Sequence, residues 1–276
     1  MRKNNSWRCI LLLILMGCTT RPEFESPNGY DLSAPEKILM KESLLEISGI
    51  AFIDQRADTV FSINDEEGRM YTQPLTGKGL VHTRFAGNGD YEDIAIFREH
   101  AFVLRSDGTI FSFPLDSAMI LETVTSVSYQ LLPKGEYEGL YADEKQQKLY
   151  ALCKQCKEKK EVLSGHSIVF FSDSLALGEP FQITIQSDQI KNKKNLLPSA
   201  FARNTTTGDW FIISSVHKTL WIIDSQWNEK ERYALDPKIF IQPEGIAFDH
   251  EQNLYISNEG NEIHNGTILK FTFHSN

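Results

Sequence analysis

The segment EISGIAF (Glu46–Phe52) decides the fold, because variants of it recur along the chain. The other copies are DYEDIAIF (Asp90–Phe97), EYEGLYA (Glu136–Ala142), LPSAFA (Leu197–Ala202) and QPEGIAF (Gln242–Phe248). If Gly49 and the matching residue of each later copy are equivalent, successive copies are 44, 46, 61 and 45 residues apart. A fixed period of this size indicates a protein built from repeated supersecondary units.

Each copy is followed by short runs of β-branched and aromatic residues, separated by turns rich in Gly, Asn and Asp. The second runs are TVFSIND, AFVLRSD, KLYALCK, WFIISSV and NLYISNE, and the third runs are RMYTQPL, TIFSFPL, SIVFFSD, TLWIIDS and TILKFTF. A weaker fourth run precedes the next copy, as in LVHTRFA, VSYQLL and FQITI. Four short strands per repeat predict an all-β protein, a β-propeller.

The repeat also predicts the number of blades. Gly49 to the C-terminus spans 228 residues, close to five periods. The long step exceeds the period by 16 residues, too few for a sixth four-stranded blade, and we place the excess in loops at 153–165 and 187–195. The last copy ends after its third strand and would leave an open sheet edge. We expect EKILMK (Glu36–Lys41) to supply the missing strand, pair with the last blade and close a ring of five blades.

In a propeller, the first strand of each blade lines the central channel and the second strand returns to the face where the first began. Polar residues at the starts of first strands and the ends of second strands should therefore form one ring, which we call the funnel. Its predicted members are Glu46, Ser48, Asn64, Asp65, Asp90, Glu92, Arg105, Glu136, Glu138, Ser199, Gln242, Glu244, Asn258 and Glu259.

Carboxylates that point at one axis repel one another at low dielectric. A cation, Arg105 or water in a wide channel would keep them ionised; otherwise some of them would be protonated. Oxygen ligands without convergent His or Cys suit Ca²⁺ or Mg²⁺ better than zinc. The acidic residues can equally cap strand starts and accept hydrogen bonds between blades. The sequence leaves the metal interpretation and the structural interpretation both open.

Other features carry less chemistry. Cys153 and Cys156 form a C-K-Q-C motif, and outside the cytoplasm we expect them to pair as a local disulfide. The S-G-H-S run at Ser164–Ser167 resembles a turn before a strand, and the chain has no G-x-S-x-G motif. No catalytic residue can be named.

The first 17 residues have the features of a bacterial lipoprotein signal peptide. A basic start precedes the apolar run Cys9–Met16, which is shorter than the roughly 20 residues of a membrane-spanning helix. The run ends in LMGC (Leu15–Cys18), which resembles a lipobox, whose cysteine is acylated. We expect a signal peptide at 1–17, a lipid such as palmitate on Cys18, a lipidated tether at 18–29, and one propeller domain at 30–276.

The charge balance limits the partners. The chain has 28 Lys and Arg against 37 Asp and Glu, a formal net charge of −9, and removal of residues 1–17 would leave −12. An acidic surface without a basic face argues against nucleic acid as a ligand. We expect a monomer that contacts the membrane through its lipid alone. Thr19 does not match the signal for inner-membrane retention, so we place the protein in the cell envelope, on the outer membrane facing the periplasm.

The motifs E-I-S-G-I-A, E-G-L-Y and P-E-G-I-A-F-D, with L-Y-I-S-N-E near the end, resemble the SdiA-regulated family of bacterial proteins, the YjiK-like propellers. P-E-G-I-A-F-D is also similar to strands of gluconolactonase-like and NHL-type propellers. The resemblance implies an exported β-propeller with a cation in its funnel. From this resemblance we expect cation ligands only at the positions that match the family motif, namely Glu92, Glu138 and Glu244. Ser48 and Ser199 depart from the motif.

Two functions follow from these observations. The first is a lipid-anchored binding or scaffold module, whose funnel holds a small-molecule, glycan or protein ligand, with Ca²⁺ or Mg²⁺ as a candidate structural ion. The second is a metal-dependent hydrolase of an ester, lactone or phosphoester, in which the metal activates water and Glu46 or Glu136 acts as the general base. We favour the binding module, because no complete acid–base or nucleophile set can be named.

Overall fold

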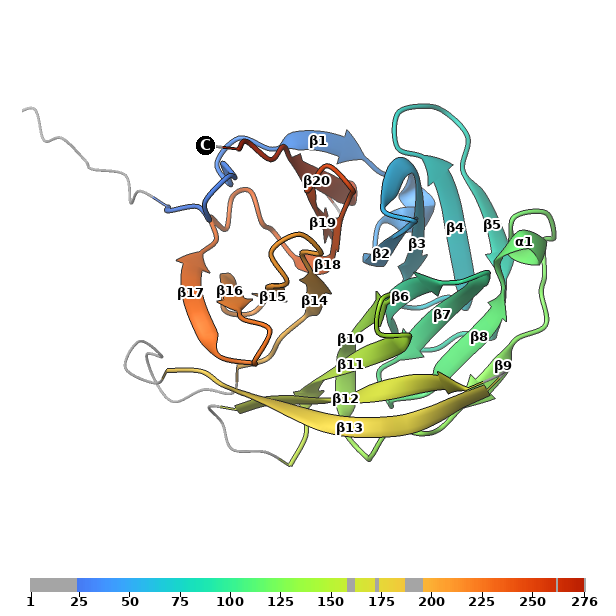
Figure 1. Ribbon diagram of the computed structural model, residues 1–276. Helices are drawn as coiled ribbons and strands as arrows, with labels where there is room; N and C mark the ends of the chain where they lie inside the picture. Colours follow the sequence, from blue (N-terminus) through green and yellow to red (C-terminus); the bar gives the residue numbers. More distant parts are fainter. Residues whose placement is uncertain (1–23, 158–161, 172–173, 187–195, 262, 276) are drawn as a thin grey trace, which may run out of the picture.

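The computed structural model describes residues 24–157, 162–171, 174–186, 196–261 and 263–275. In these residues it contains five four-stranded antiparallel sheets. The sheets are arranged in a ring, with their first strands innermost (Figure 1). The first strands of neighbouring blades pack against one another all the way around this ring. The prediction of a five-bladed β-propeller is therefore confirmed.

The blades follow one another along the chain, with the innermost strand first in each. Blade 1 contains β2 (Ile47–Ile53), β3 (Arg56–Asn64), β4 (Arg69–Pro74) and β5 (Val81–Arg84). Blade 2 contains β6 (Tyr91–Phe97), β7 (His100–Arg105), β8 (Ile110–Pro114) and β9 (Val127–Tyr129). Blade 3 contains β10 (Glu136–Asp143), β11 (Lys148–Gln155), β12 (Val162–Phe171) and β13 (Ser174–Thr184). Blade 4 contains β14 (Ala200–Arg203), β15 (Trp210–Ser214), β16 (Thr219–Ile223) and β17 (Glu229–Ala234).

Blade 5 combines the two ends of the propeller. It contains β18 (Pro243–Phe248), β19 (Leu254–Asn258), β20 (Thr267–Phe271) and the N-terminal strand β1 (Glu36–Leu39). β1 pairs with β20 in antiparallel register, with Ile38 opposite Ile268, and so closes the ring as predicted. The described helices are a short 3-10 turn (Glu42–Leu44) and α1 (Leu115–Ala118), and neither is long and apolar enough to cross a membrane.

Apolar side chains fill the spaces between neighbouring blades. The described residues form five buried clusters, and each cluster joins one blade to the next. In β15, Trp210 and Ile212 pack toward blade 3, whereas Phe211 and Ile213 pack toward blade 5. Successive side chains of a strand point to opposite faces of its sheet, so one strand serves two clusters. The near-continuous apolar runs of the second and third strands follow from this arrangement.

The small residue shared by the repeats lies where two first strands approach closely. A Cβ atom added to Gly49 would lie 2.6 Å from the Cα atom of Asp93, and one added to Gly245 would lie 2.5 Å from the carbonyl oxygen of Ser48. Close backbone approach therefore requires glycine at both positions. Blade 2 has Asp93 instead, and its buried carboxylate accepts a hydrogen bond of 2.7 Å from the amide nitrogen of Leu140 in blade 3.

Blade 3 differs from the prediction in its outer strands. β12 begins at Val162 and pairs with both β11 and β13, so Ser164–Ser167 lies in a strand and not in a turn. A Cβ atom at Gly165 would collide with the carbonyl oxygen of Ala151 and with the ring of Phe181. Glycine is therefore present for close packing, whereas the sequence suggested a turn. The loop predicted at 153–165 was wrong in its last residues, and the loop at 187–195 lies outside the described residues.

Candidate functional site

β-Bulges at the starts of the first strands position the acidic residues of the repeat. The pairing of β6 with β7 shifts between Tyr91 and Asp93, which leaves Glu92 without a residue opposite it. The same shift occurs at Glu138 in blade 3 and at Glu244 in blade 5. An extra residue in one strand bends that strand and re-aims its side chain. In blades 2, 3 and 5 the repeat glutamate therefore lies in a bulge that directs its carboxyl group toward the channel.

Lys154 supplies positive charge within this group of carboxylates. Its Nζ atom lies 2.5 Å from Oε1 of Glu138 and 3.4 Å from Oε1 of Glu136. Burial lowers the pKa of Lys154, but the two carboxylates outweigh burial and the pKa is raised. Burial raises the pKa of Glu138, which is 3% exposed, and Lys154 opposes that rise. The ammonium group thus stabilises a buried carboxylate in its ionised form.

The pKa of Glu92 is raised beside Glu138, which favours its protonated form. Burial raises the pKa of Glu92, and the charges of Glu138 and Asp90 raise it further. Hydrogen bonding between the two carboxyl groups raises the pKa of Glu92 and lowers that of Glu138, which favours a proton on Glu92. Lys154, Glu138 and Glu92 therefore interact as one group, in which Lys154 favours an ionised Glu138 and Glu138 favours a protonated Glu92.

Three more acidic groups in the funnel have raised pKa values. Burial, followed by the charge of Glu138, raises the pKa of Glu244 to about 7. Burial, followed by the charge of Glu244, raises the pKa of Glu259 to about 8. Burial, followed by the charge of Glu46, raises the pKa of Asp65 to about 6. These groups destabilise one another when ionised, and an added positive charge would relieve that repulsion.

Two serines predicted to line the funnel are buried between blades. Ser199 is 4% exposed, and its hydroxyl donates a hydrogen bond of 2.8 Å to the carbonyl oxygen of Pro243 in the next blade. Ser48 is 2% exposed, and its carbonyl oxygen accepts a hydrogen bond of 2.6 Å from Ser257. Both therefore connect neighbouring blades, which is the structural interpretation for these two positions.

The two predicted asparagines are also buried. Oδ1 of Asn64 accepts a hydrogen bond from the amide nitrogen of Glu67, at 2.9 Å, in the turn after β3. Nδ2 of Asn258 donates to the carbonyl oxygen of Ile239 at 2.9 Å. These side chains stabilise the ends of second strands and leave the funnel to the residues that follow them.

Arg105 lies outside the funnel. Its guanidinium group binds Asp107 through two hydrogen bonds, of 3.1 and 2.7 Å, and lies over the ring of Phe111. When the second strands of the blades are aligned by their pairing with the first strands, Arg105 is equivalent to Asn64. The side chains that reach the funnel belong to the next position of this alignment. That position contains Asp65, Lys154 and Glu259. An alignment of the second strands places Lys154 beside Asp65 and Glu259, so Lys154 could have been predicted to reach the funnel, and our prediction omitted it.

The remaining predicted residues lie at the rim of the funnel. Glu136 accepts a hydrogen bond of 2.6 Å from Gln155 as well as contacting Lys154. The side-chain amide of Gln242 donates to the carboxylate of Glu259. Asp90 is exposed and contributes its charge to Asp65 and Glu92.

The metal expectation does not fit this arrangement. Among the described residues, no group of three or more His, Cys, Asp or Glu side chains is placed to hold a metal ion. Ca²⁺ needs six to eight oxygen ligands, but the most buried carboxylate of the three candidates, Glu138, is bound to the Lys154 ammonium. The cation that these residues hold is a side chain of the same protein.

Cys153 and Cys156 are joined by a disulfide next to the funnel, across three positions of the chain. Cys153 is buried, and its neighbour Lys154 projects toward Glu138. The disulfide therefore restrains the segment that carries the central lysine.

Fold and site together define a five-bladed β-propeller with an acidic central funnel. The chain belongs to the SdiA-regulated family, whose model matches residues 27–265. No curated protein matches the chain.

Solved structures share the propeller fold at low sequence identity. Glutaminyl cyclase from Myxococcus xanthus is 13% identical, with a TM-score of 0.57, over 87% of this chain and 98% of that one. A protein of unknown function from Bacteroides thetaiotaomicron is 12% identical, with a TM-score of 0.51, over 77% of this chain and 52% of that one. A catalytically inactive virginiamycin B lyase from Staphylococcus aureus, with quinupristin, is 12% identical, with a TM-score of 0.50, over 87% and 99%. These likenesses concern the fold alone.

Proposed function

We propose that the protein is a non-catalytic binding module whose funnel takes a small molecule bearing alkylammonium groups. One observation supports this proposal above all: the carboxyl groups in the funnel outnumber the ammonium groups, and the Lys154 ammonium is bound by two of the carboxylates. The acidic groups that interact there are Glu46, Asp65, Asp90, Glu92, Glu136, Glu138, Glu244 and Glu259. The described lysines that interact with them are Lys154 and Lys218.

The Lys154 contacts support an organic cation in particular. A primary ammonium offers three hydrogen-bond donors and needs no fixed coordination geometry, unlike a metal ion. Glu138 and Glu136 already bind such a group at 2.5 and 3.4 Å. Glu244, Glu259 and Asp65 face the funnel without a comparable salt bridge among the described residues, so a ligand amine would supply the missing charge.

A cavity on the same side of the propeller gives the ligand room. It has a volume of about 310 Å³ and is lined by Lys154, Ser215, Lys218 and Glu244, among others. The ammonium of Lys218 donates to the carbonyl oxygen of Ile241 at 2.7 Å and so is engaged by the backbone. Within this cavity Glu244 therefore provides a carboxylate for a ligand amine.

Protonation should be coupled to binding. Burial and repulsion raise the pKa values of Glu244 and Glu259 to about 7 and about 8. A bound cation favours their ionised forms and lowers these pKa values, so binding releases protons. We therefore expect tighter amine binding at pH 8.5 than at pH 6.

Calorimetric titration with 1,5-diaminopentane tests the proposal, with 1,5-pentanediol as the uncharged probe. We expect the diamine to bind and the diol not to bind, and we expect Glu244→Gln with Glu259→Gln to weaken the diamine by about tenfold or more. Glu122→Gln, at an exposed position, is the matched control and should bind like the wild type. Equal diamine affinity in the double variant and the wild type refutes the proposal. Binding of Ca²⁺ without diamine binding, lost in the double variant, favours the metal interpretation instead.

The metal-dependent hydrolase is not proposed. Its metal would need the oxygen atoms that Glu138 gives to Lys154 and that Glu92 uses in its hydrogen bond to Glu138.

We also propose that the module is anchored to the outer membrane, facing the periplasm, by a lipid on Cys18. The sequence LMGC (Leu15–Cys18) supports this, and these residues lie outside the described part of the chain. Labelled palmitate added to cells that express the protein should appear on the wild type and not on Cys18→Ser. The variant should also leave the detergent phase in a Triton X-114 partition. Labelling of Cys18→Ser at the wild-type level would contradict the proposal.

A further inference from the structure

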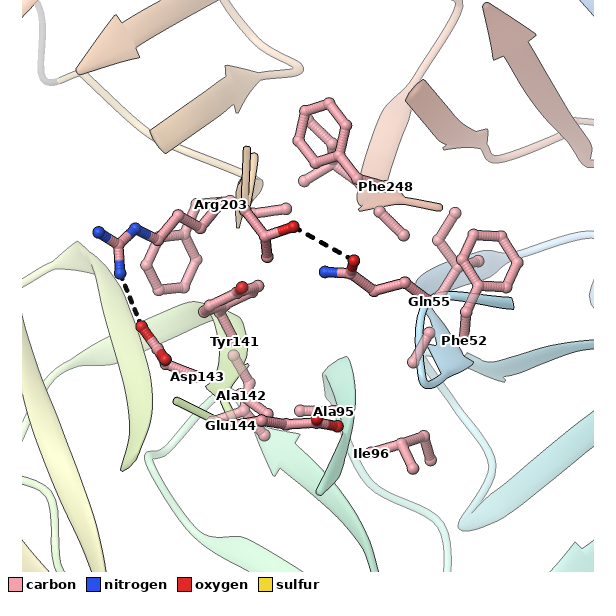
Figure 2. A pocket seen from close by; sticks show the side chains of 18 of the residues that line it. Phe52, Gln55, Ala95, Ile96, Tyr141, Ala142, Asp143, Glu144, Arg203 and Phe248 are labelled. Carbon is pink, nitrogen blue, oxygen red and sulfur yellow. Dashed lines mark hydrogen bonds and ion pairs between the residues drawn. The ribbon is translucent and has the colours of Figure 1, made fainter. Parts of the chain in front are cut away.

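The opposite mouth of the channel holds a second pocket, made by the far ends of the first strands. Its volume is about 450 Å³, within the usual range for small-molecule sites. All five first strands, β2, β6, β10, β14 and β18, contribute lining residues. Figure 2 shows their side chains surrounding one hollow. No residue of the proposed amine site lines this pocket.

Apolar side chains form part of the walls of this pocket. Phe52, Ile96 and Phe248 are 6–8% exposed and line the hollow from three different blades. Ala95 and Ala142 add small side chains that keep the space open, as Figure 2 shows. Apolar surface of this kind favours a ligand with an aromatic or aliphatic ring.

The charged pair in the wall is neutral as a unit. Nη1 of Arg203 lies 2.7 Å from Oδ2 of Asp143, and Nε of Arg203 donates to the carbonyl oxygen of Gly208 at 3.0 Å. The guanidinium carbon also lies 5.5 Å from the ring centre of Trp210. These contacts satisfy the pair internally, so it shapes the wall without attracting a charged ligand.

Tyr141 offers a hydrogen-bond donor to the hollow. Its ring packs edge-on against Trp210, with 5.1 Å between centroids, and its hydroxyl has no hydrogen-bond partner among the described residues. Burial and then the charge of Asp143 raise the pKa of Tyr141, which keeps the hydroxyl protonated. A buried hydroxyl without a hydrogen-bond partner costs free energy, so a ligand with a hydrogen-bond acceptor near Tyr141 would be favoured.

Gln55 offers a second donor from another blade. Asp54 and Gln55 have φ angles of 49° and 55° and form the two-residue turn between β2 and β3. This turn brings Gln55 over the pocket, where its Oε1 atom accepts a hydrogen bond of 3.2 Å from Thr205. The amide nitrogen is then left for a ligand, and Figure 2 shows it on the side of Tyr141.

The rim carries more acidic than basic groups, because Asp54 and Glu144 stand against Lys145, and Asp143 is paired with Arg203. The pKa of Glu144 is raised by burial and then by the charges of Asp54 and Asp143, which shows that these acidic groups act on one another at the pocket edge. A carboxylate ligand would add to this repulsion.

We infer that this pocket binds an uncharged, ring-bearing small molecule, whose carbonyl or amide oxygen accepts hydrogen bonds from Tyr141 and Gln55. The apolar walls bury the ring, and the two donors orient the oxygen. The site is separate from the amine-binding funnel, so one molecule can hold both ligands.

Ligand-observed NMR with benzamide and benzoate tests this inference, because the two probes share the ring and differ in charge. We expect benzamide to bind at millimolar concentration or better, and benzoate to bind at least several-fold more weakly. Tyr141→Phe keeps the ring that packs on Trp210 and should weaken benzamide by about two- to tenfold. Ala142→Phe fills the hollow and should abolish binding, with thermal melts confirming that both variants fold.

Benzamide binding that is unchanged in Tyr141→Phe and in Ala142→Phe overturns the inference, as does benzoate binding equal to that of benzamide. The Glu244→Gln, Glu259→Gln double variant should bind benzamide like the wild type. This separates the outcome from that of the proposed function, because the double variant is impaired only toward the diamine.

Discussion

Replacement of Lys154 by methionine should destabilise the propeller through Glu138. The side chain of Glu138 is 4% exposed and lies 2.5 Å from the Lys154 ammonium. Methionine retains much of the aliphatic stem but removes the charge, so Glu138 becomes a buried carboxylate that lacks its salt bridge. Lys230→Met is the matched control, because Lys230 binds Asp209 at 2.7 Å with 43% of the lysine side chain exposed.

The two substitutions should differ in magnitude because of burial. Removal of one partner from a buried pair costs about 3–5 kcal/mol, and we expect about 3 kcal/mol since Lys154 retains some exposure. An exposed pair contributes about 1 kcal/mol or less. At roughly 2–4 °C per kcal/mol, Lys154→Met should melt about 6–12 °C below the wild type at pH 8.

The cost should depend on pH. In the wild type the pKa of Glu138 is raised to about 6, and without Lys154 it rises further. The cost of the substitution therefore grows as the pH rises above the wild-type value and is complete above the value in the variant. At pH 5 Glu138 is protonated in the variant and the cost should be small. Adding Glu138→Gln to Lys154→Met should restore stability to within about 1 kcal/mol at pH 8.

Thermal and urea unfolding at pH 5 and pH 8 measure these differences. The reasoning is refuted if Lys154→Met loses no more stability than Lys230→Met at pH 8. It is equally refuted by a loss at pH 5 that matches the loss at pH 8.

Two other predictions concern the funnel carboxyls and the repeat glycine. Glu244 and Glu259 have pKa values raised to about 7 and about 8, so the folded state holds protons that the unfolded state releases. Stability should fall as the pH rises from about 5 to 8, and melts of the double Gln variant should show a shallower slope; equal slopes would contradict this. Gly245→Ala should cost about 2 kcal/mol by urea unfolding because its Cβ meets the Ser48 carbonyl. Gly77→Ala, which meets only ordinary contacts, should change stability by less than about 1 kcal/mol; equal effects would contradict the packing argument.

The sequence predicted most of the fold because the relevant signals are local. Strand runs and turns repeat at a near-constant period, and four of the five first strands carry glycine or alanine where neighbouring first strands approach closely, with Asp93 at that position in blade 2. The closing strand Glu36–Leu39 was predictable because blade 5 otherwise lacked an edge partner. Blade 3 was less predictable, because Gly165 is selected by contact with Ala151 and not by a turn.

The site was only partly predictable, because register decides which side chain faces the channel. Asn64 and Asp65 are adjacent in sequence, yet Asn64 stabilises a turn and Asp65 interacts with the acidic funnel. Arg105 was assigned to the funnel by its position in the alignment and lies outside it with Asp107. Lys154 was overlooked within a charged segment, although it binds the most buried of the acidic groups assigned to the funnel.

By itself the sequence determined the five-bladed ring, its closure and the acidic character of one mouth of the channel. These depend on periodicity and composition, which are written along the chain. The tertiary structure decided that Lys154 is the cation of the funnel and that Tyr141 and Gln55 meet at the opposite mouth. Such contacts join residues from different strands or different blades, and β-bulges and close packing set their positions, so periodicity does not specify them.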